Sequence, residues 1–246
     1  MRLQEVLHHA FWLKKGGRPM ATRRTAALAM WWDMAAHMKA EFENWHTHEH
    51  FPERLGIPGF LRSSRWTDAD NGEGVFVLYE LENHSVLSSK PYLARLNAPT
   101  PWSTALMPHH RGMVRAQCHV MASCGGVVAR YAATLRFSIE QGDAEAFIAS
   151  LSPRLKRLSE DAGIVGAHLL RHETPRIDLT TEQKIRKTPD KPADWVLIVC
   201  GYARDVLQRE VDSVFADDSL ARFKLTRDGQ WHTYALSYSA LPSDRA

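Results

Sequence analysis

The residues of this chain whose types and spacing best suit chemistry lie in one histidine-rich stretch, His46-Thr-His-Glu-His50. His46 and His50 are four positions apart, so on a helix they project from the same side, one turn apart. Imidazoles titrate near neutral pH, and such a pair can act as acid and base or hydrogen-bond a substrate. The H-E-x-x-H order of zinc peptidases is absent, so we expect no metal site.

Glu49 adds a carboxyl group to this stretch. In a helix over residues 37–51 it falls on the apolar stripe that should face a sheet. The stripe consists of Met38, Phe42, Trp45 and Glu49. Burial without a partner raises the pKa of an acid, which suits a general base or acid near neutral pH. Alternatively, Glu49 is structural and caps the turn at 56–59 or pairs with Arg54 or Arg62.

Further candidates come from the segments that follow. Tyr92 or Arg62 could stabilise the oxygen of a developing enolate. The proline-rich segment 97–103 is predicted to be a loop at the mouth of a cleft between helices and sheet. There Asn97 and Trp102 either contact a small aromatic or lactone-like substrate or belong to a rigid connector.

His119 is a candidate because of an alternating strand, 113–123. One face of this strand is small and apolar, which suits packing beneath helices, and the other carries Arg115, Gln117 and His119. We expect the polar face to point into a barrel. There it forms a hydrogen-bond network between the two halves of the chain or lines a ligand cavity.

The elements that position these residues follow one order twice. In the first half, strands are expected at 26–34, 60–67, 75–82 and 113–123, with helices at 37–51 and 85–96; Pro52 should end or kink the first helix. In the second half, strands are expected at 128–137, 165–172, 195–202 and 231–238, with helices at 143–160 and 206–223 and an extra charged loop at 173–194. G-x-x-G turns, Gly56–Gly59 and Gly163–Gly166, follow the first helix of each half.

Each half is thus a β-α-β-β-α-β unit, a ferredoxin-like repeat whose sheet has one face without helices. Packing the two bare faces together buries both. The predicted fold class is α+β, with two fused ferredoxin-like repeats forming a pseudo-symmetric α+β barrel. The expected organisation is a basic N-terminal extension (1–25), repeat 1 (26–124) and repeat 2 (127–242).

One motif supports a family resemblance. The pattern W-x-x-x-E-H-x-P-E-R-L-x-I-P-G-F is matched by Trp45, Glu49, His50, Pro52, Glu53, Arg54, Leu55, Ile57, Pro58, Gly59 and Phe60. The chain resembles the dimeric α+β barrel superfamily in its fused form. Its first half is similar to EthD-type members and to a group of uncharacterised bacterial proteins that share the pattern.

The fused form also resembles chlorite dismutase-like proteins, and this resemblance implies haem bound by a histidine of the C-terminal repeat. Here the predicted helices of the second half contain no histidine, and only the strand residues His168 and His172 lie near. Haem is therefore the alternative, and our first expectation is that no cofactor is used.

Composition limits the remaining possibilities. The 246 residues carry a net charge of +3, but residues 1–25 alone carry +5, with six basic side chains and one acidic, and the remainder carries −2. That extension is excluded from the fold prediction, since Met20 could be the true start instead of Met1, and no nucleic-acid partner is expected. No apolar run is long enough to span a membrane, and the three cysteines form no C-x-x-C pair, which favours a reducing cytoplasm.

These patterns together predict a small-molecule enzyme. We expect a cofactor-independent lyase or isomerase that transfers a proton on an aromatic or catabolic intermediate; a cofactor-free monooxygenase and a non-catalytic ligand-binding or structural barrel are alternatives. Glu49, His50 or His46 would be the acid or base. The chain is expected to be a monomer with an intramolecular barrel or a homodimer.

Overall fold

The computed structural model describes residues 24–186, 193–214, 220, 222–227 and 231–244. Apart from Arg24 and Thr25, the predicted basic extension lies outside the described residues, and so do both candidate start positions. Within the described residues, no helix is long and apolar enough to cross a membrane.

The first half contains four strands and the helices that cover them. Its elements are β1 (Ala26–Met34), η1 (Ala36–Met38), α1 (Lys39–Trp45), η2 (His46–His50), α2 (Phe51–Leu55), β2 (Phe60–Asp68), β3 (Gly74–Leu81), η3 (His84–Ser88), α3 (Lys90–Asn97), α4 (Pro101–Leu106), η4 (Met107–His109) and β4 (His110–Gly125). The strands agree with the predicted ranges to within three residues at each end.

The second half repeats the order. Its elements are β5 (Tyr131–Ile139), α5 (Ala144–Leu158), β6 (Ile164–His172), α6 (Thr181–Arg186), β7 (Trp195–Gly201), α7 (Arg204–Ser213), β8 (Leu225–Arg227), β9 (His232–Ala240) and η5 (Pro242–Asp244). The predicted β-α-β-β-α-β duplication is confirmed, with β8 and α6 as additions.

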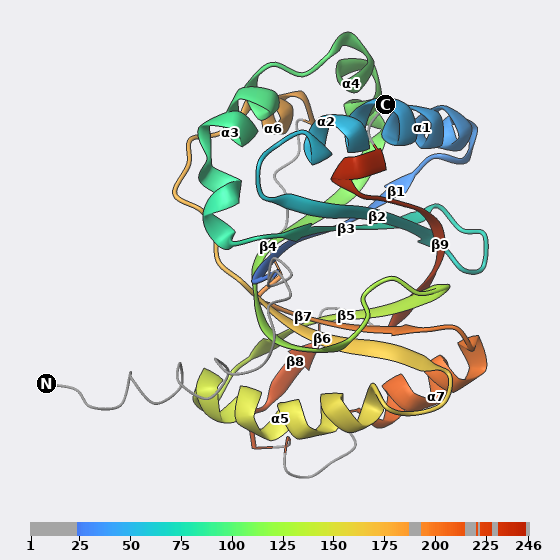
Figure 1. The fold of residues 1–246 in the computed structure, drawn as a ribbon, viewed down its shortest axis with the longest axis vertical. Helices are drawn as coiled ribbons and strands as arrows, with labels where there is room; N and C mark the ends of the chain where they lie inside the picture. Colours follow the sequence, from blue (N-terminus) through green and yellow to red (C-terminus); the bar gives the residue numbers. More distant parts are fainter. Residues whose placement is uncertain (1–23, 187–192, 215–219, 221, 228–230, 245–246) are drawn as a thin grey trace, which may run out of the picture.

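The strands form one closed antiparallel barrel. The first-half strands pair in the order β4-β1-β3-β2, and the second-half strands in the order β6-β7-β5-β9. The long strand β4 continues from β1 onto β6, and β2 pairs with β9, so both edges of each sheet are joined to the other sheet. Closure removes the free edges that an open sheet would present. Figure 1 shows α1–α4 and α6 over the first-half strands and α5 and α7 on the opposite side.

Gly59 and Gly163 occupy equivalent places in the two halves. Each precedes the second strand of its half, with φ angles of +92° and +102°. A Cβ atom at Gly59 would lie 2.4 Å from Cγ2 of Val86, and one at Gly163 would lie 2.9 Å from Cβ of Val206. Val86 belongs to η3 and Val206 to α7. The two glycines therefore permit the same close approach of helix and turn.

The barrel interior is apolar, and β4 contributes small side chains to it. Val114, Ala116 and Cys118 of β4 lie in it together with residues of all the other main strands. Arg115 points the other way, where its Nη2 donates to the hydroxyl of Tyr92 on α3 at 2.7 Å. The prediction that the polar face of this strand enters the barrel was wrong. An eight-stranded barrel is only wide enough for side chains to fill it, so the small residues turn inward.

Two segments predicted to be loops contain helices. Residues 101–106 form α4, where Thr100 caps the helix by accepting from the Ser103 amide and Pro101 begins it. Residues 181–186 form α6. There Thr180 accepts from the Gln183 amide, and Gln183 Oε1 accepts from the Thr180 amide at 3.0 Å, a capping box.

Candidate functional site

A π-helical segment positions the two histidines of the motif. In η2 the amide of Phe51 donates to the carbonyl of His46, five residues earlier. The extra residue in this turn shifts the side chains relative to a regular α-helix. Both His46 and His50 are consequently buried, at 2% and 9% exposure. The wide turn also relieves the collision expected at Pro52, so the helix runs on to Leu55.

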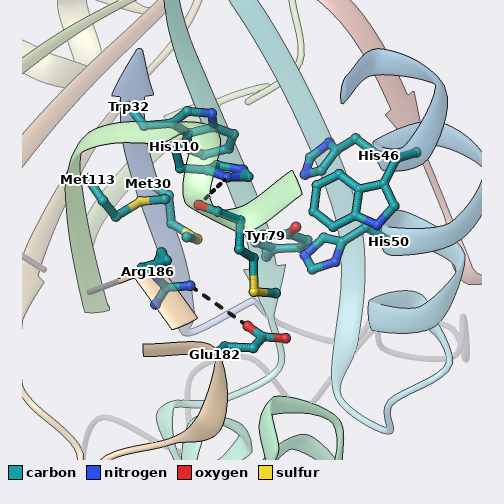
Figure 2. Close-up of a pocket in the computed structure, with 11 residues that line it drawn as sticks. Met30, Trp32, His46, His50, Tyr79, His110, Met113, Glu182 and Arg186 are labelled. Carbon is teal, nitrogen blue, oxygen red and sulfur yellow. Dashed lines mark hydrogen bonds and ion pairs between the residues drawn. The ribbon is translucent and has the colours of Figure 1, made fainter. Parts of the chain in front are cut away.

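The histidines face a cavity between the helices and the barrel. One compartment, of about 30 Å³, is lined by Met30, Trp32, Trp45, His46, His50, Tyr79, Met107, His110, Met113, Glu182 and Arg186. Figure 2 shows His46, His50 and His110 on one side of it and the Glu182–Arg186 pair of α6 on the other. We call it the histidine compartment. Its volume suits one or two water molecules.

A second compartment adjoins the first. It has a volume of about 20 Å³ and is lined by Leu28, Met30, His50, Arg54, Tyr79, Tyr92, Leu96, Arg115, Thr180, Glu182 and Arg186. We call it the arginine compartment. Five residues line both compartments and so lie where the two meet: Met30, His50, Tyr79, Glu182 and Arg186.

All three imidazoles of the histidine compartment are held in the neutral form. Burial lowers the pKa of His46 well below 6.5, and His50 and Arg65 lower it further. Burial and Arg54 lower the pKa of His50 in the same way, and burial lowers that of His110 to about 4. Within the described part of the chain, Nδ1 of His46 and Nδ1 of His50 have no hydrogen-bond partner. Nδ1 of His110, by contrast, contacts the carbonyl oxygens of Leu106 and Met107.

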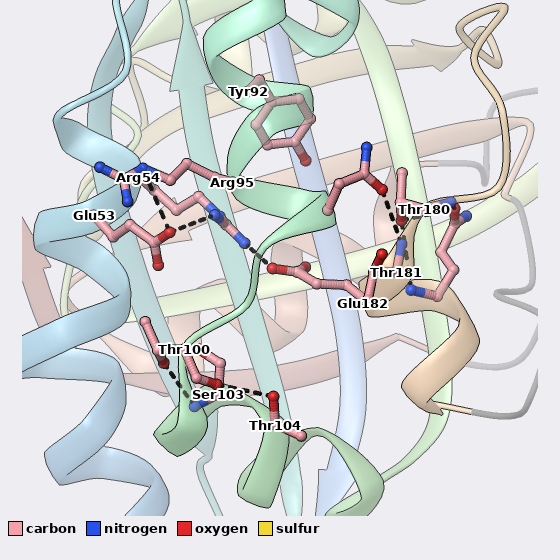
Figure 3. A network of polar contacts seen from close by, with 12 residues as sticks. Glu53, Arg54, Tyr92, Arg95, Thr100, Ser103, Thr104, Thr180, Thr181 and Glu182 are labelled. Atoms are coloured by element: carbon pink, nitrogen blue, oxygen red, sulfur yellow. Dashed lines mark hydrogen bonds and ion pairs between the residues drawn. The ribbon is translucent and has the colours of Figure 1, made fainter.

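A buried ion pair attaches α6 to the first half. Nη2 of Arg54 donates to Oε1 of Glu182 at 2.5 Å, and the two side chains are only 4% and 7% exposed. Burial alone would lower the pKa of Arg54, but Glu182 raises it above its usual value. The Thr181 amide also donates to Oδ1 of Asn97 at 3.0 Å. Figure 3 shows this network extending from Glu53 and Arg54 to Thr180 and Glu182. The second half of the chain thereby closes a cavity in the first.

Glu49 does not line either compartment. Its Oε1 accepts hydrogen bonds from the indole of Trp45 at 3.0 Å and from the hydroxyl of Thr100 at 2.5 Å. These contacts tie η2 to the start of α4. Neither of the structural roles predicted for Glu49 is observed, since Arg54 pairs with Glu182 and Arg62 pairs with Glu80 at 3.2 Å.

The other predicted site residues are separated from the histidines, except Tyr92, which lines the arginine compartment. Arg62 pairs with Glu80 of β3. Glu80 lies two positions after Leu78, a residue of the barrel interior, so both side chains are on the barrel side of the sheet. Trp102 donates to Oε1 of Glu41 at 2.7 Å. Asn97 is exposed and holds the amide of Thr181, as above.

His119 also lies away from the cavity. Its ring stacks on that of His84 with centroids 4.3 Å apart, and its Nε2 lies 3.1 Å from a carboxylate oxygen of Glu173. Of the eight predicted site residues, the structure therefore brings together His46, His50 and Tyr92.

Sequence reasoning missed several residues of the cavity. His110 and Tyr79 gave no signal, because a lone histidine at a strand start and a tyrosine in an apolar strand are common. Arg54 was part of the family-like motif but was considered only as a partner of Glu49. Glu182 and Arg186 could have been found from the capping-box pattern Thr180-Thr-Glu-Gln183 together with their own i, i+4 spacing.

The matching layer of the second half contains no such cavity among the described residues. Large apolar side chains of α5 and α7, among them Phe147, Leu151 and Leu207, fill it. His168 turns away from this layer and contacts the hydroxyl of Ser123 and the carbonyl of Gly126. His172 contacts the amide of Gln117 and the hydroxyl of Thr174. The described residues of this half therefore do not fit a haem with an axial histidine.

A metal site is not formed either. Within the described ranges, no group of three or more histidine, cysteine, aspartate or glutamate side chains is arranged to hold a metal ion. The chemistry available in the cavity is that of neutral imidazoles, the hydroxyls of Tyr79 and Tyr92, and charged guanidinium and carboxylate groups.

Comparison with solved structures defines the class of protein by its fold. An anthrone oxidase-like protein aligns with a TM-score of 0.63 and 11% identity, over 91% of this chain and 96% of the other. A candidate monooxygenase from Lactobacillus acidophilus NCFM aligns with a TM-score of 0.55 and 11% identity, over 89% and 97%. Chlorite dismutase from Candidatus Nitrospira defluvii, in complex with imidazole, aligns with a TM-score of 0.51 and 10% identity, over 88% and 93%.

The chain therefore has the ferredoxin-like α+β barrel fold that these proteins share. No family model and no curated protein matches the sequence. The resemblance of the first half to EthD-type proteins stays a prediction. Because one fold hosts many reactions, the activity has to be inferred from the cavity.

Proposed function

We propose that the protein is a small-molecule enzyme, a lyase or isomerase that transfers a proton without a cofactor, and that His50 is its base. The observation that carries the proposal is the position of His50. Its ring is buried and neutral, Nδ1 has no described partner, and the side chain lies where the two compartments meet. A neutral imidazole can accept a proton at once, whereas an imidazolium cannot.

The surrounding groups supply the rest of a proton-transfer site. The carbon acid gives its proton to His50, and the electron pair moves onto the carbonyl oxygen to form an enolate. Burial raises the pKa of Tyr79, so its hydroxyl stays protonated and can donate to that oxygen. The proton then returns to another carbon in an isomerase, or a leaving group departs in a lyase. Closure by α6 keeps bulk water from the intermediate.

In this scheme His46 supports the base by packing against the ring of His50. The two rings stack with centroids 5.2 Å apart and planes 18° apart, and the ring of Trp45 lies 4.5 Å from that of His50. These contacts fix the orientation of the base. His46 is therefore proposed as a positioning residue, and Glu49, which was the first candidate for the base, is proposed to be structural.

Proton exchange into solvent tests the proposal across a range of candidate substrates. The protein is incubated in D₂O with a panel of small carbonyl compounds, and loss of the acidic C–H signal is followed by NMR. We expect His50→Gln to lower the exchange rate about 10²- to 10⁴-fold. The matched control is His48→Gln, two positions away, because His48 is exposed and contacts only Asn44. Equal rates for the two variants would refute the role of His50.

Two further measurements separate the alternatives. The oxidase and monooxygenase names of the fold relatives motivate an oxygen electrode in the same assay, since oxygen uptake with an aromatic substrate would favour a cofactor-free monooxygenase. A Soret band after titration with haem would favour the haem alternative. Ligand-induced stabilisation without any turnover would favour a binding protein.

A further inference from the structure

A buried cation without a carboxylate partner lines the arginine compartment. Arg115 is 7% exposed and donates from Nη2 to the hydroxyl of Tyr92 at 2.7 Å. No ion pair joins it to an aspartate or glutamate in the part of the chain that the structure describes. Burying a charge without a counter-charge is costly, so such groups in proteins are usually paired or bind a ligand of opposite sign.

The described acids near the compartment pair with arginines other than Arg115. Three guanidinium groups line it, those of Arg54, Arg115 and Arg186, against the single carboxylate of Glu182. Glu182 already contacts Arg54 at 2.5 Å and Arg186 at 3.9 Å. The remaining nearby acid, Glu53, lies 3.6 Å from Arg54 and is not among the lining residues. Neither carboxylate neutralises Arg115.

From this arrangement we infer that the arginine compartment binds the carboxylate of the substrate, with Arg115 as its main partner, and that the substrate is a compact enolisable carboxylic acid. The inference rests on the proposed function, because it names the substrate class of the same site. A guanidinium matches a carboxylate with two parallel N–H donors, and the hydroxyl of Tyr92 adds a third donor beside it.

The position of His50 supports this assignment. A carboxylate held by Arg115 leaves the rest of the molecule directed toward the histidine compartment, because His50 and Tyr79 line both spaces. The acidic carbon then lies between the anion subsite and the base. The volumes of about 30 and 20 Å³ limit the occupant to a few carbon atoms.

Binding of small acids and their neutral amides tests the subsite. Pyruvate and acetate are compared with pyruvamide and acetamide by thermal shift and isothermal titration. We expect the acids to bind at least ten times more tightly than the amides. Arg115→Met should weaken binding of the acids about 10- to 100-fold and leave binding of the amides unchanged. The matched control is Arg65→Met, since Arg65 is also buried, at 3% exposure, but lines neither compartment.

Conservative variants keep the test decisive if Arg115→Met does not fold. Arg115→Lys retains the charge but loses the forked pair of donors, and Tyr92→Phe removes only the hydroxyl. Each is expected to weaken binding of the acids about tenfold. Equal affinity of acids and amides, or unchanged affinity in every Arg115 and Tyr92 variant, would overturn the inference and leave Arg115 as a support for Tyr92.

The outcomes also separate this inference from the proposed function. His50→Gln is expected to lower the rate of proton exchange about 10²- to 10⁴-fold while it retains the preference for acids over amides. Exchange of neutral ketones without any preference for carboxylates would refute the subsite and leave the proton-transfer proposal standing. A clear preference for carboxylates without proton exchange on any compound would refute the proton-transfer proposal and leave the carboxylate subsite standing.

Discussion

Replacing Glu182 by glutamine should destabilise the protein, because it leaves the cation of Arg54 buried without its closest partner. The two side chains are 4% and 7% exposed, and removing one member of a buried pair costs about 3–5 kcal/mol. Glu53 remains 3.6 Å from Arg54 and offsets part of the loss, so the lower end, about 3 kcal/mol, is expected. For a chain of this size that corresponds to a Tm lower by roughly 6–12 °C.

Differential scanning calorimetry and hydrogen exchange measure the effect of Glu182→Gln. The control is Glu160→Gln, because Glu160 pairs with Lys156 on the surface, with side chains 60% and 69% exposed, and an exposed pair contributes little to stability. The double variant Arg54→Met/Glu182→Leu should recover most of the lost stability, since it removes both charges. A Glu182→Gln protein with unchanged Tm and unchanged exchange in residues 181–186 would show that the pair does not hold α6.

Three other perturbations test the structure. Glu49→Gln should lower stability by about 1 kcal/mol and leave proton exchange intact, because an amide oxygen still accepts from Trp45 and Thr100; a large loss of activity in a stable variant would return Glu49 to the mechanism. Gly59→Ala should cost about 2 kcal/mol or more, and Gly112→Ala about 1, since both have positive φ but only the first Cβ meets a neighbour, at 2.4 Å; equal urea midpoints would contradict this. Acid should destabilise the fold between about pH 6.5 and pH 4, where the unfolded chain takes up protons that the buried histidines, among them His110 with a pKa of about 4, do not bind; His110 alone contributes a slope of about 1.4 kcal/mol per pH unit, and His110→Asn should reduce the total slope by about that amount.

The element order could be predicted from the sequence because each element has a local cause. Apolar runs of strand length such as 26–34, and turn formers such as those at 68–72, mark their own boundaries. Pairing between the halves could not be derived in the same way. Strand β4 is 16 residues long and spans both sheets, which its alternation alone does not reveal. The direction of its faces was predicted wrongly because the helices were assumed to take the small residues and the barrel the polar ones.

The candidate site shows a different limit. His46 and His50 were found from their spacing, but that spacing assumes an α-helix, and the π-helical turn buries both residues on a side that also contains Trp45 and Phe42. A π-helical turn depends on tertiary packing and has no reliable mark in a single sequence. Glu49 therefore does not lie at the centre of the apolar helix stripe, where the α-helical spacing had placed it.

The cavity combines residues from both repeats, and this explains why a duplicated fold has only one such site among its described residues. In the first half, α6 from the second half packs against α3 and η4 and contributes Glu182 and Arg186 to the lining of both compartments. In the described part of the second half, apolar side chains of α5 and α7 pack on the strands and fill that layer. Helix α6, which lies in the insertion between β6 and β7, therefore has a specific role in the proposed enzyme. Through Glu182 it balances the charge of Arg54, and it leaves Arg115 as the cation available to a substrate. If so, an acid bound at Arg115 should raise the Tm of the Glu182→Gln variant by more than that of the wild type, because it replaces part of the missing negative charge; an equal rise in both proteins would show that the two carboxylate positions are independent.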